Sequence, residues 1–186
     1  MLYNASAGFG GFSHSELRGL RWDDWQVGQM FVAQSVGDDN LVCETKNEYR
    51  EAAVPIIPML SAVLSALRSA EGNPKTGYIF AGKKGQPLNL HNLANRAIKP
   101  AMRAAGLEWH GWHAFRRGLA TNLKKLGVDD GHIQRILRHG DRGTTQRFYI
   151  RELPEAAVEA MNLMEKELCT IVHRLEEESR REAVVN

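Results

Sequence analysis

Residues 137–150, with the sequence LRHGDRGTTQRFYI, place His139 and Tyr149 ten positions apart in a polar and basic stretch. A tyrosine hydroxyl is a nucleophile, and a histidine ring donates hydrogen bonds to anionic oxygens. Taken alone, the pair has a simpler explanation, in which the tyrosine packs its ring and the histidine lies on the surface. Other residues of suitable chemistry must decide between the two.

A second pair, His113 and Arg116, is separated by three positions at the predicted start of a helix, so the two side chains share a face. That face differs from the apolar stripe of Phe115, Leu119 and Leu123, and the pair need not belong to the core. A guanidinium binds two phosphate oxygens at once, and an imidazole donates one further hydrogen bond. The pair therefore suits a phosphate, although a helix-capping histidine and a surface arginine are the simpler explanation of these two residues alone.

The order of these residues resembles the catalytic domain of the tyrosine recombinases, the phage integrase family. Lys46, in a predicted β-hairpin, precedes the His-x-x-Arg pair, and the second histidine and the tyrosine follow. The resemblance covers nearly the whole chain. It rests on the fragments SELRGLRWDDW, TKN followed by VPII, HAFRRGLATNLKKLGV, IQRILRHGD and TTQRFYI. Each fragment is weak alone, but their order and spacing together make a strong signal.

The resemblance implies DNA strand exchange through a 3′-phosphotyrosyl intermediate. Tyr149 would attack a backbone phosphate, and Arg116, His113 and His139 would bind its non-bridging oxygens. Lys46 would protonate the leaving 5′-oxygen. The covalent link conserves bond energy, so rejoining is expected to need no ATP. Because side chains supply the positive charges, no metal or other cofactor is expected. We also predict DNA contacts for Arg50, Arg142 and Arg147.

Two positions depart from the family pattern. The family has Gly-x-Arg-x-x-Glu-Leu at the first motif, but residues 11–17 read GFSHSEL, so Ser13 stands where the arginine is expected. Neither Arg18 nor Arg21, later in the same helix, obviously replaces it. Loss of one preorganised donor costs roughly 10²–10³ in rate in other enzymes. The tyrosine also follows the histidine by ten positions, whereas the more usual nine would select Phe148.

Turn residues and hydrophobic patterns predict the elements that must position these side chains. The capping-box sequence from Ser13 to Glu16 begins a helix that reaches about Arg21. Runs 29–36, 41–46 and 52–57 predict a three-stranded antiparallel meander, with Lys46 at the edge of its second turn. Helices are predicted over 58–72, 89–106 (kinked or split by Pro100), 113–127, 130–140 and 154–183, with a short one from Thr144 or Thr145 carrying Tyr149.

These elements predict a single α+β domain over residues 1–186, mainly α-helical, with a small three-stranded antiparallel sheet at one edge.

The net charge of +2 is unevenly distributed. Residues 101–151 contain ten Lys and Arg against four Asp and Glu, and residues 152–186 contain four against nine. A basic segment favours an anionic partner such as double-stranded DNA, although a solvated helix face is as good an explanation of the charge alone. The apolar stripe of the last helix suits either packing on its own domain or a homo-oligomer on DNA.

Other features of the sequence concern the cellular location of the protein and the alternatives to a recombinase function. No apolar run is long enough for a membrane span, and the first residues do not resemble a secretory signal. Cys43 and Cys169 are expected to be buried thiols, which favours a cytoplasmic protein. The family's N-terminal DNA-clamping domain is expected to be absent. The substitution at Ser13 favours an alternative, a DNA-binding remnant with impaired catalysis, and a helical interaction protein unrelated to DNA is a third hypothesis.

Overall fold

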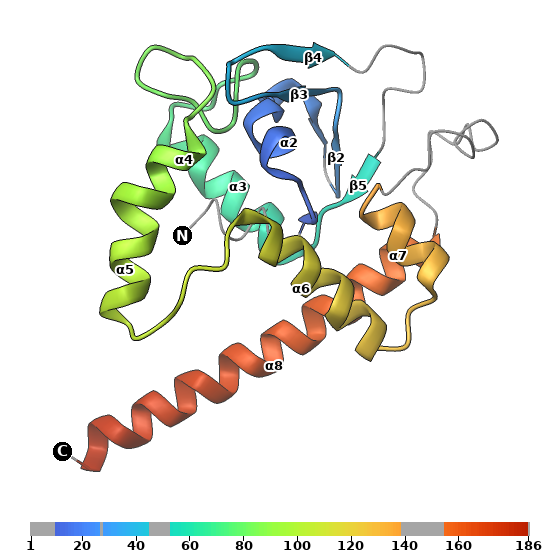
Figure 1. The fold of residues 1–186 in the computed structure, drawn as a ribbon. Helices are drawn as coiled ribbons and strands as arrows, with labels where there is room; N and C mark the ends of the chain where they lie inside the picture. Colours follow the sequence, from blue (N-terminus) through green and yellow to red (C-terminus); the bar gives the residue numbers. More distant parts are fainter. Residues whose placement is uncertain (1–9, 27, 45–52, 139–154, 186) are drawn as a thin grey trace.

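The computed structural model describes residues 10–26, 28–44, 53–138 and 155–185 of the chain (Figure 1). Its helices are α2 (His14–Gly19), α3 (Pro58–Ala70), α4 (Leu90–Leu93), α5 (Lys99–Ala104), α6 (Trp112–Lys125), α7 (Asp130–Ile136) and α8 (Glu155–Val185). A 3-10 turn, η1 (Trp22–Asp24), and a π-helical turn, η2 (Ala94–Ile98), lie between them. The strands are β1 (Trp25–Gln26), β2 (Gln29–Phe31), β3 (Gln34–Val36), β4 (Val42–Glu44) and β5 (Ala53–Pro55). The mainly helical α+β class is confirmed.

The predicted three-stranded antiparallel sheet is confirmed, but the meander of runs 29–36, 41–46 and 52–57 is wrong, because the strands form two small antiparallel sheets. One sheet has the order β1-β2-β5, and β3 pairs only with β4 in the other. The run 29–36 changes sheet between Phe31 and Gln34, because β3 packs against α2, where the Gln34 amide donates a hydrogen bond to the Gly19 carbonyl (3.1 Å). Gly19 permits this approach, since a Cβ there would lie 2.5 Å from the Gln34 carbonyl oxygen. The predicted position of Lys46 at a turn lies outside the described residues.

The predicted helix starts and breaks are confirmed where the signal is local. The Ser13 hydroxyl accepts from the Glu16 N–H (3.3 Å), and the Glu16 carboxylate accepts from the Ser13 N–H (2.7 Å), which completes the capping box of α2. Asn89 caps α4 in a similar way. The predicted helix 89–106 is divided into α4, η2 and α5, with Pro100 in the first turn of α5. A proline removes one intrahelical hydrogen bond and displaces the carbonyl four residues earlier, which accounts for the irregular turn before it.

The core lies between the strands and the helices α2, α3, α6, α7 and the first half of α8 (Figure 1). In α8, Ala157, Ala160, Met161 and Met164 are buried in this core. The second half extends away from the domain in Figure 1, and Ile171 there is 41% exposed. The predicted apolar stripe therefore packs on its own domain over its first half, and docking of its second half on another copy remains a prediction.

Both cysteines are exposed, so the prediction of buried thiols is wrong. Cys43 lies on β4, and Cys169 lies on the part of α8 that leaves the core. No helix in the described part of the chain is both long enough and apolar enough to cross a membrane. Within the same residues, no group of three or more His, Cys, Asp or Glu side chains could hold a metal ion.

Candidate active site

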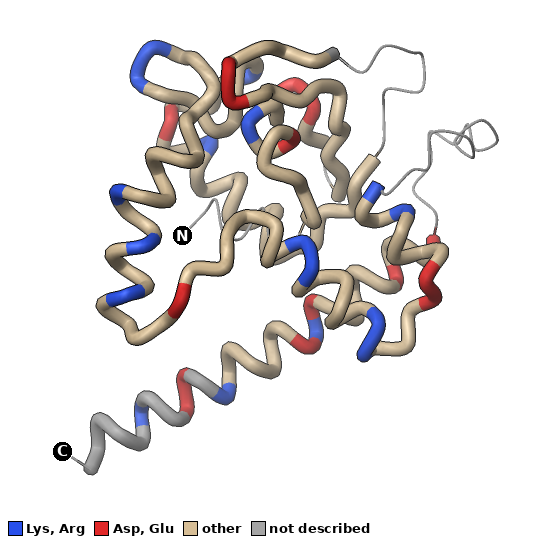
Figure 2. Tube along the Cα trace, in the orientation of Figure 1, with Lys and Arg blue, Asp and Glu red and all other residues tan. Residues whose placement is uncertain are grey.

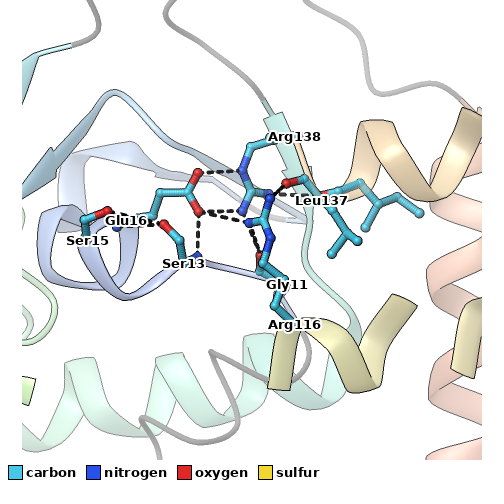
Figure 3. Close-up of polar contacts among 8 residues, drawn as sticks. Gly11, Ser13, Ser15, Glu16, Arg116, Leu137 and Arg138 are labelled. Atoms are coloured by element: carbon cyan, nitrogen blue, oxygen red, sulfur yellow. Dashed lines mark hydrogen bonds and ion pairs between the residues drawn. The ribbon is translucent and has the colours of Figure 1, made fainter. Parts of the chain in front are cut away.

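Arg116 lies in the first turns of α6, with only 7% of its surface exposed. Its guanidinium donates hydrogen bonds to the carbonyls of Gly11 (2.7 Å) and Leu137 and to the Glu16 carboxylate (3.4 Å) (Figure 3). The sequence predicts a side chain apart from the apolar stripe of α6, but Arg116 shares the buried face of this helix with Leu119. Arg116 can be buried because both terminal nitrogens of its guanidinium find oxygen acceptors inside the fold.

A second arginine, Arg138, reaches the same carboxylate from the end of α7. Its Nε donates to Glu16 Oε1 (3.1 Å), and its Nη2 donates to Glu16 Oε2 (2.9 Å) and to the Gly11 carbonyl (3.0 Å). Its Nη1 donates to the Ile136 carbonyl (2.9 Å). Sequence reasoning did not select Arg138 as a site residue. The available signal was its position in the basic segment, directly before His139.

Glu16, Arg116 and Arg138 form a group that we call the arginine cluster. Burial raises the pKa of Glu16, but the hydrogen bond and charge of Arg138, the N–H of Ser13 and the charge of Arg116 outweigh it, so the pKa lies below its usual value. Burial lowers the pKa of Arg116, and the charge of Arg138 lowers it further against the opposing charge of Glu16. Two guanidinium groups share one carboxylate, so the cluster carries one positive charge in excess. A mostly buried site with excess positive charge favours an anion such as phosphate.

His113 lies beside this cluster in the chain but in a different environment. It is exposed at the start of α6, whereas Arg116, one turn later, is buried. The predicted common face therefore does not give the two side chains the same surroundings. Burial is the largest cause of the lowered pKa of the nearby His14, and Asp38, 3.7 Å away, opposes it. The charges of Arg18, His91 and His113 lower the His14 pKa further.

The structure describes three of the residues predicted to carry or replace catalytic function. Arg116 and Ser13 are brought together, because both contact Glu16, and His113 lies at the same end of α6. The remaining predicted residues lie outside the described ranges. They are Lys46, Arg50, His139, Arg142, Arg147 and Tyr149.

Comparison with known proteins identifies the fold that holds this cluster. The sequence model of the phage integrase family matches residues 10–155. The chain belongs to the phage integrase family. The tyrosine recombinase XerC of Stutzerimonas stutzeri is 30% identical over 138 residues, which cover 73% of this chain and 42% of the relative. A XerC-like tyrosine recombinase of Caldanaerobacter subterraneus subsp. tengcongensis is 25% identical over 181 residues, which cover 82% of this chain and 46% of the relative.

Solved integrase structures share the fold at lower sequence identity. A Tn1549 transposon integrase in complex with transposon right-end DNA superposes with a TM-score of 0.63 at 18% identity, covering 86% of this chain and 56% of the integrase chain. The integrase of mycobacterium phage Brujita gives a TM-score of 0.59 at 19% identity, covering 87% and 50% of the two chains. The chain thus spans about half the length of the relatives that it matches, and Glu16, Arg116 and Arg138 lie within the residues that the family model matches.

Proposed function

We propose that this chain cleaves and rejoins double-stranded DNA in site-specific recombination, through a 3′-phosphotyrosyl intermediate. The observation that carries the proposal is the arginine cluster, in which Arg116 is buried and held in place inside a phage integrase fold. The relatives are tyrosine recombinases by name, and the Tn1549 integrase structure contains DNA.

Exposed basic residues support DNA as the substrate. The Lys and Arg residues of η2, α5 and α6 are blue in Figure 2, and most of their side chains are exposed. The exposed members are Arg96, Arg103, Arg117, Lys124 and Lys125. One of them is offset by an acidic neighbour, since the Lys124 ammonium lies 2.7 Å from Asp130. Such residues bind the DNA backbone without reading its sequence.

The proposed reaction assigns one role to each predicted side chain. The Tyr149 hydroxyl loses its proton to solvent as its oxygen bonds to phosphorus, the bond from phosphorus to the 5′-oxygen breaks, and Lys46 gives that oxygen a proton. Arg116, His113 and His139 hold the non-bridging oxygens, whose charge grows in the transition state. In the second step, the 5′-hydroxyl of another strand attacks the phosphotyrosine and releases the tyrosine. One phosphodiester is exchanged for another, so the balance of bonds needs no nucleotide.

A nicked suicide duplex tests the proposal, because cleavage beside the nick releases a short fragment and traps the covalent adduct. A pool of such duplexes, randomised around the nick, supplies the unknown target, and denaturing gels separate the protein–DNA adduct. We expect an adduct from the unaltered chain, none from Tyr149→Phe and at least about a 10²-fold slower reaction from Arg116→Ala. An adduct that persists in Tyr149→Phe would overturn the assignment of the nucleophile.

A second function, DNA binding without cleavage, is favoured by one observation. Ser13 occupies the position expected for an arginine, and its hydroxyl accepts from the Glu16 N–H as the cap of α2, so it offers no positive charge to a phosphate. Retention of the duplex pool by the unaltered chain, with no adduct from any duplex, would select this function over strand cleavage.

A further inference from the structure

We propose that Arg138 takes the place of the arginine expected at position 13 and sets a second guanidinium beside Arg116 at the scissile phosphate. The inference rests on the proposed function, because it assigns Arg138 to the same reaction. It makes Arg138 a catalytic residue and explains how a chain with Ser13 at this position could still cleave DNA.

The Arg138 guanidinium and the backbone of position 13 meet at the same carboxylate oxygen. The Ser13 N–H and Arg138 Nη2 donate to the same oxygen of Glu16, at 2.7 Å and 2.9 Å. Arg138 and Arg116 also donate to the same carbonyl, that of Gly11. Two guanidinium groups therefore converge on the start of α2 from α6 and from the end of α7, as the dashed contacts in Figure 3 show.

The two arginines that follow Ser13 in the sequence serve other sites. Arg18 is fully buried, and its guanidinium donates to the carbonyls of Leu88 (3.1 Å) and Gly37 and to the Asn40 side chain (2.5 Å). It therefore holds the β3–β4 hairpin against α2. Arg21 lies 3.2 Å from the Asp23 carboxylate and over the ring of Tyr78. Neither contacts Glu16 or Arg116 in the described part of the chain.

Arg138 is held in a fixed orientation, as a phosphate-binding group must be. Its backbone has a φ of +53°, a left-handed conformation that residues with a Cβ seldom adopt. Its side chain is 10% exposed, and its guanidinium lies 5.1 Å from the centre of the Phe12 ring. Its four hydrogen bonds to described residues use four of the five N–H groups of a guanidinium. Counted over the described residues, one N–H of the Arg138 guanidinium remains for a phosphate oxygen.

Two substitutions of Arg138 test its role, because glycine adopts the left-handed backbone at this position more easily than alanine does. Arg138→Ala removes the guanidinium, and Arg138→Gly removes it while suiting the left-handed backbone. We expect both variants to bind the selected duplex and to form the adduct about 10²–10³-fold more slowly at saturating DNA. Adding Ser13→Arg to Arg138→Ala should restore much of the rate, because the new arginine starts beside the same carboxylate. Lys75→Ala, which removes an exposed charge outside the basic residues of η2, α5 and α6, is the control and should leave the rate at saturating DNA unchanged.

A methylphosphonate at the scissile position separates a catalytic role from a structural one. This group lacks one anionic oxygen, so a missing positive charge should matter much less for its cleavage. We expect Arg138→Ala to approach the rate of the unaltered chain on methylphosphonate DNA. An equal loss on both substrates, or no loss on either, would overturn the role of Arg138 while the unaltered chain still forms the adduct. If the unaltered chain forms no adduct with either substrate, the proposed function fails and the role of Arg138 fails with it.

Discussion

At the scale of single residues, the Glu16 carboxylate connects three segments of the chain. It accepts hydrogen bonds from the start of α2 through the Ser13 N–H, from α6 through Arg116 and from the end of α7 through Arg138. Its side chain is 18% exposed, so water offsets these contacts only in part. Removal of one partner from such a group leaves the other charges buried without compensation, which is costly. Glu16 therefore determines both the position of the two arginines and a share of the stability.

Glu16→Gln should lower the free energy of unfolding by about 3 kcal/mol at neutral pH, because two guanidinium groups lose their carboxylate. The pKa of Glu16 is lower in the folded chain than its ordinary value of 4.5. The ionised carboxylate therefore stabilises the fold above about pH 4.5, and this contribution is lost as the pH falls through the folded-state pKa. Urea unfolding followed by tryptophan fluorescence at several pH values measures it. Glu159→Gln, at an exposed position on α8, is the control.

Stability that declines equally with acid in Glu16→Gln and in the unaltered chain would contradict this prediction. So would a Glu159→Gln variant that is destabilised as much as Glu16→Gln.

The sequence predicted contacts between residues that are close in the chain, but it did not predict contacts between residues that are far apart. Ser13 and Glu16 form a capping box within one turn, so their pairing follows from spacing alone. Arg116 contacts the Gly11 carbonyl across 105 positions, and Arg138 contacts Glu16 across 122. No periodicity encodes such contacts, and an arginine has too little apolar character to indicate burial. The arginine motif thus predicted a phosphate site, but neither the burial of Arg116 nor the part played by Arg138.

At the scale of elements, α8 combines two functions along its length. Its first half supplies buried apolar residues to the core, and it also caps another helix. The first residue before α3, Ile57, offers no capping side chain, and the Met59 N–H donates instead to the Glu165 carboxylate (2.7 Å). A carboxylate at a helix N-terminus satisfies an N–H group and interacts favourably with the helix dipole. The sequence did not predict how the strands are divided, because the strand-like run 29–36 gave no sign that β2 and β3 belong to different sheets.

Glu165→Ala should lower the free energy of unfolding by about 1 kcal/mol, since α3 loses its N-terminal cap. Glu167→Ala is the matched control, because this residue is an exposed glutamate on the same helix. Its effect should stay within about 0.5 kcal/mol. Thermal or urea unfolding of the two variants against the unaltered chain measures the difference. Equal effects would show that the contact between α8 and α3 does not contribute to stability.

At the scale of the whole molecule, positive and negative charges lie on different elements, although the net charge is small. Exposed Lys and Arg residues follow η2, α5 and α6, whereas α8 is mainly acidic. The arginine cluster, at the junction of α2, α6 and α7, adds one buried positive charge in excess. The exposed charges would bind phosphates along a duplex, and the buried one would act on a single phosphate. Affinity and cleavage should therefore depend on different residues.

Binding of the chain to duplex DNA should fall steeply as salt rises, because the exposed arginines and lysines displace counterions from phosphates. About four phosphate contacts would lower the affinity about 100-fold between 50 mM and 200 mM salt. Fluorescence anisotropy of a labelled duplex over this range gives the slope of log affinity against log salt.

Arg103→Ala, which removes an exposed charge from α5, should make the slope shallower by about one contact if α5 faces the DNA. Arg138→Ala should change the slope by no more than about one contact, since in the proposed reaction its guanidinium meets a single phosphate and otherwise contacts Glu16 and Gly11 inside the fold. An affinity that does not change with salt would exclude the exposed basic residues as the contact surface, and a large change in slope for Arg138→Ala would show that its charge acts in binding and not at one phosphate.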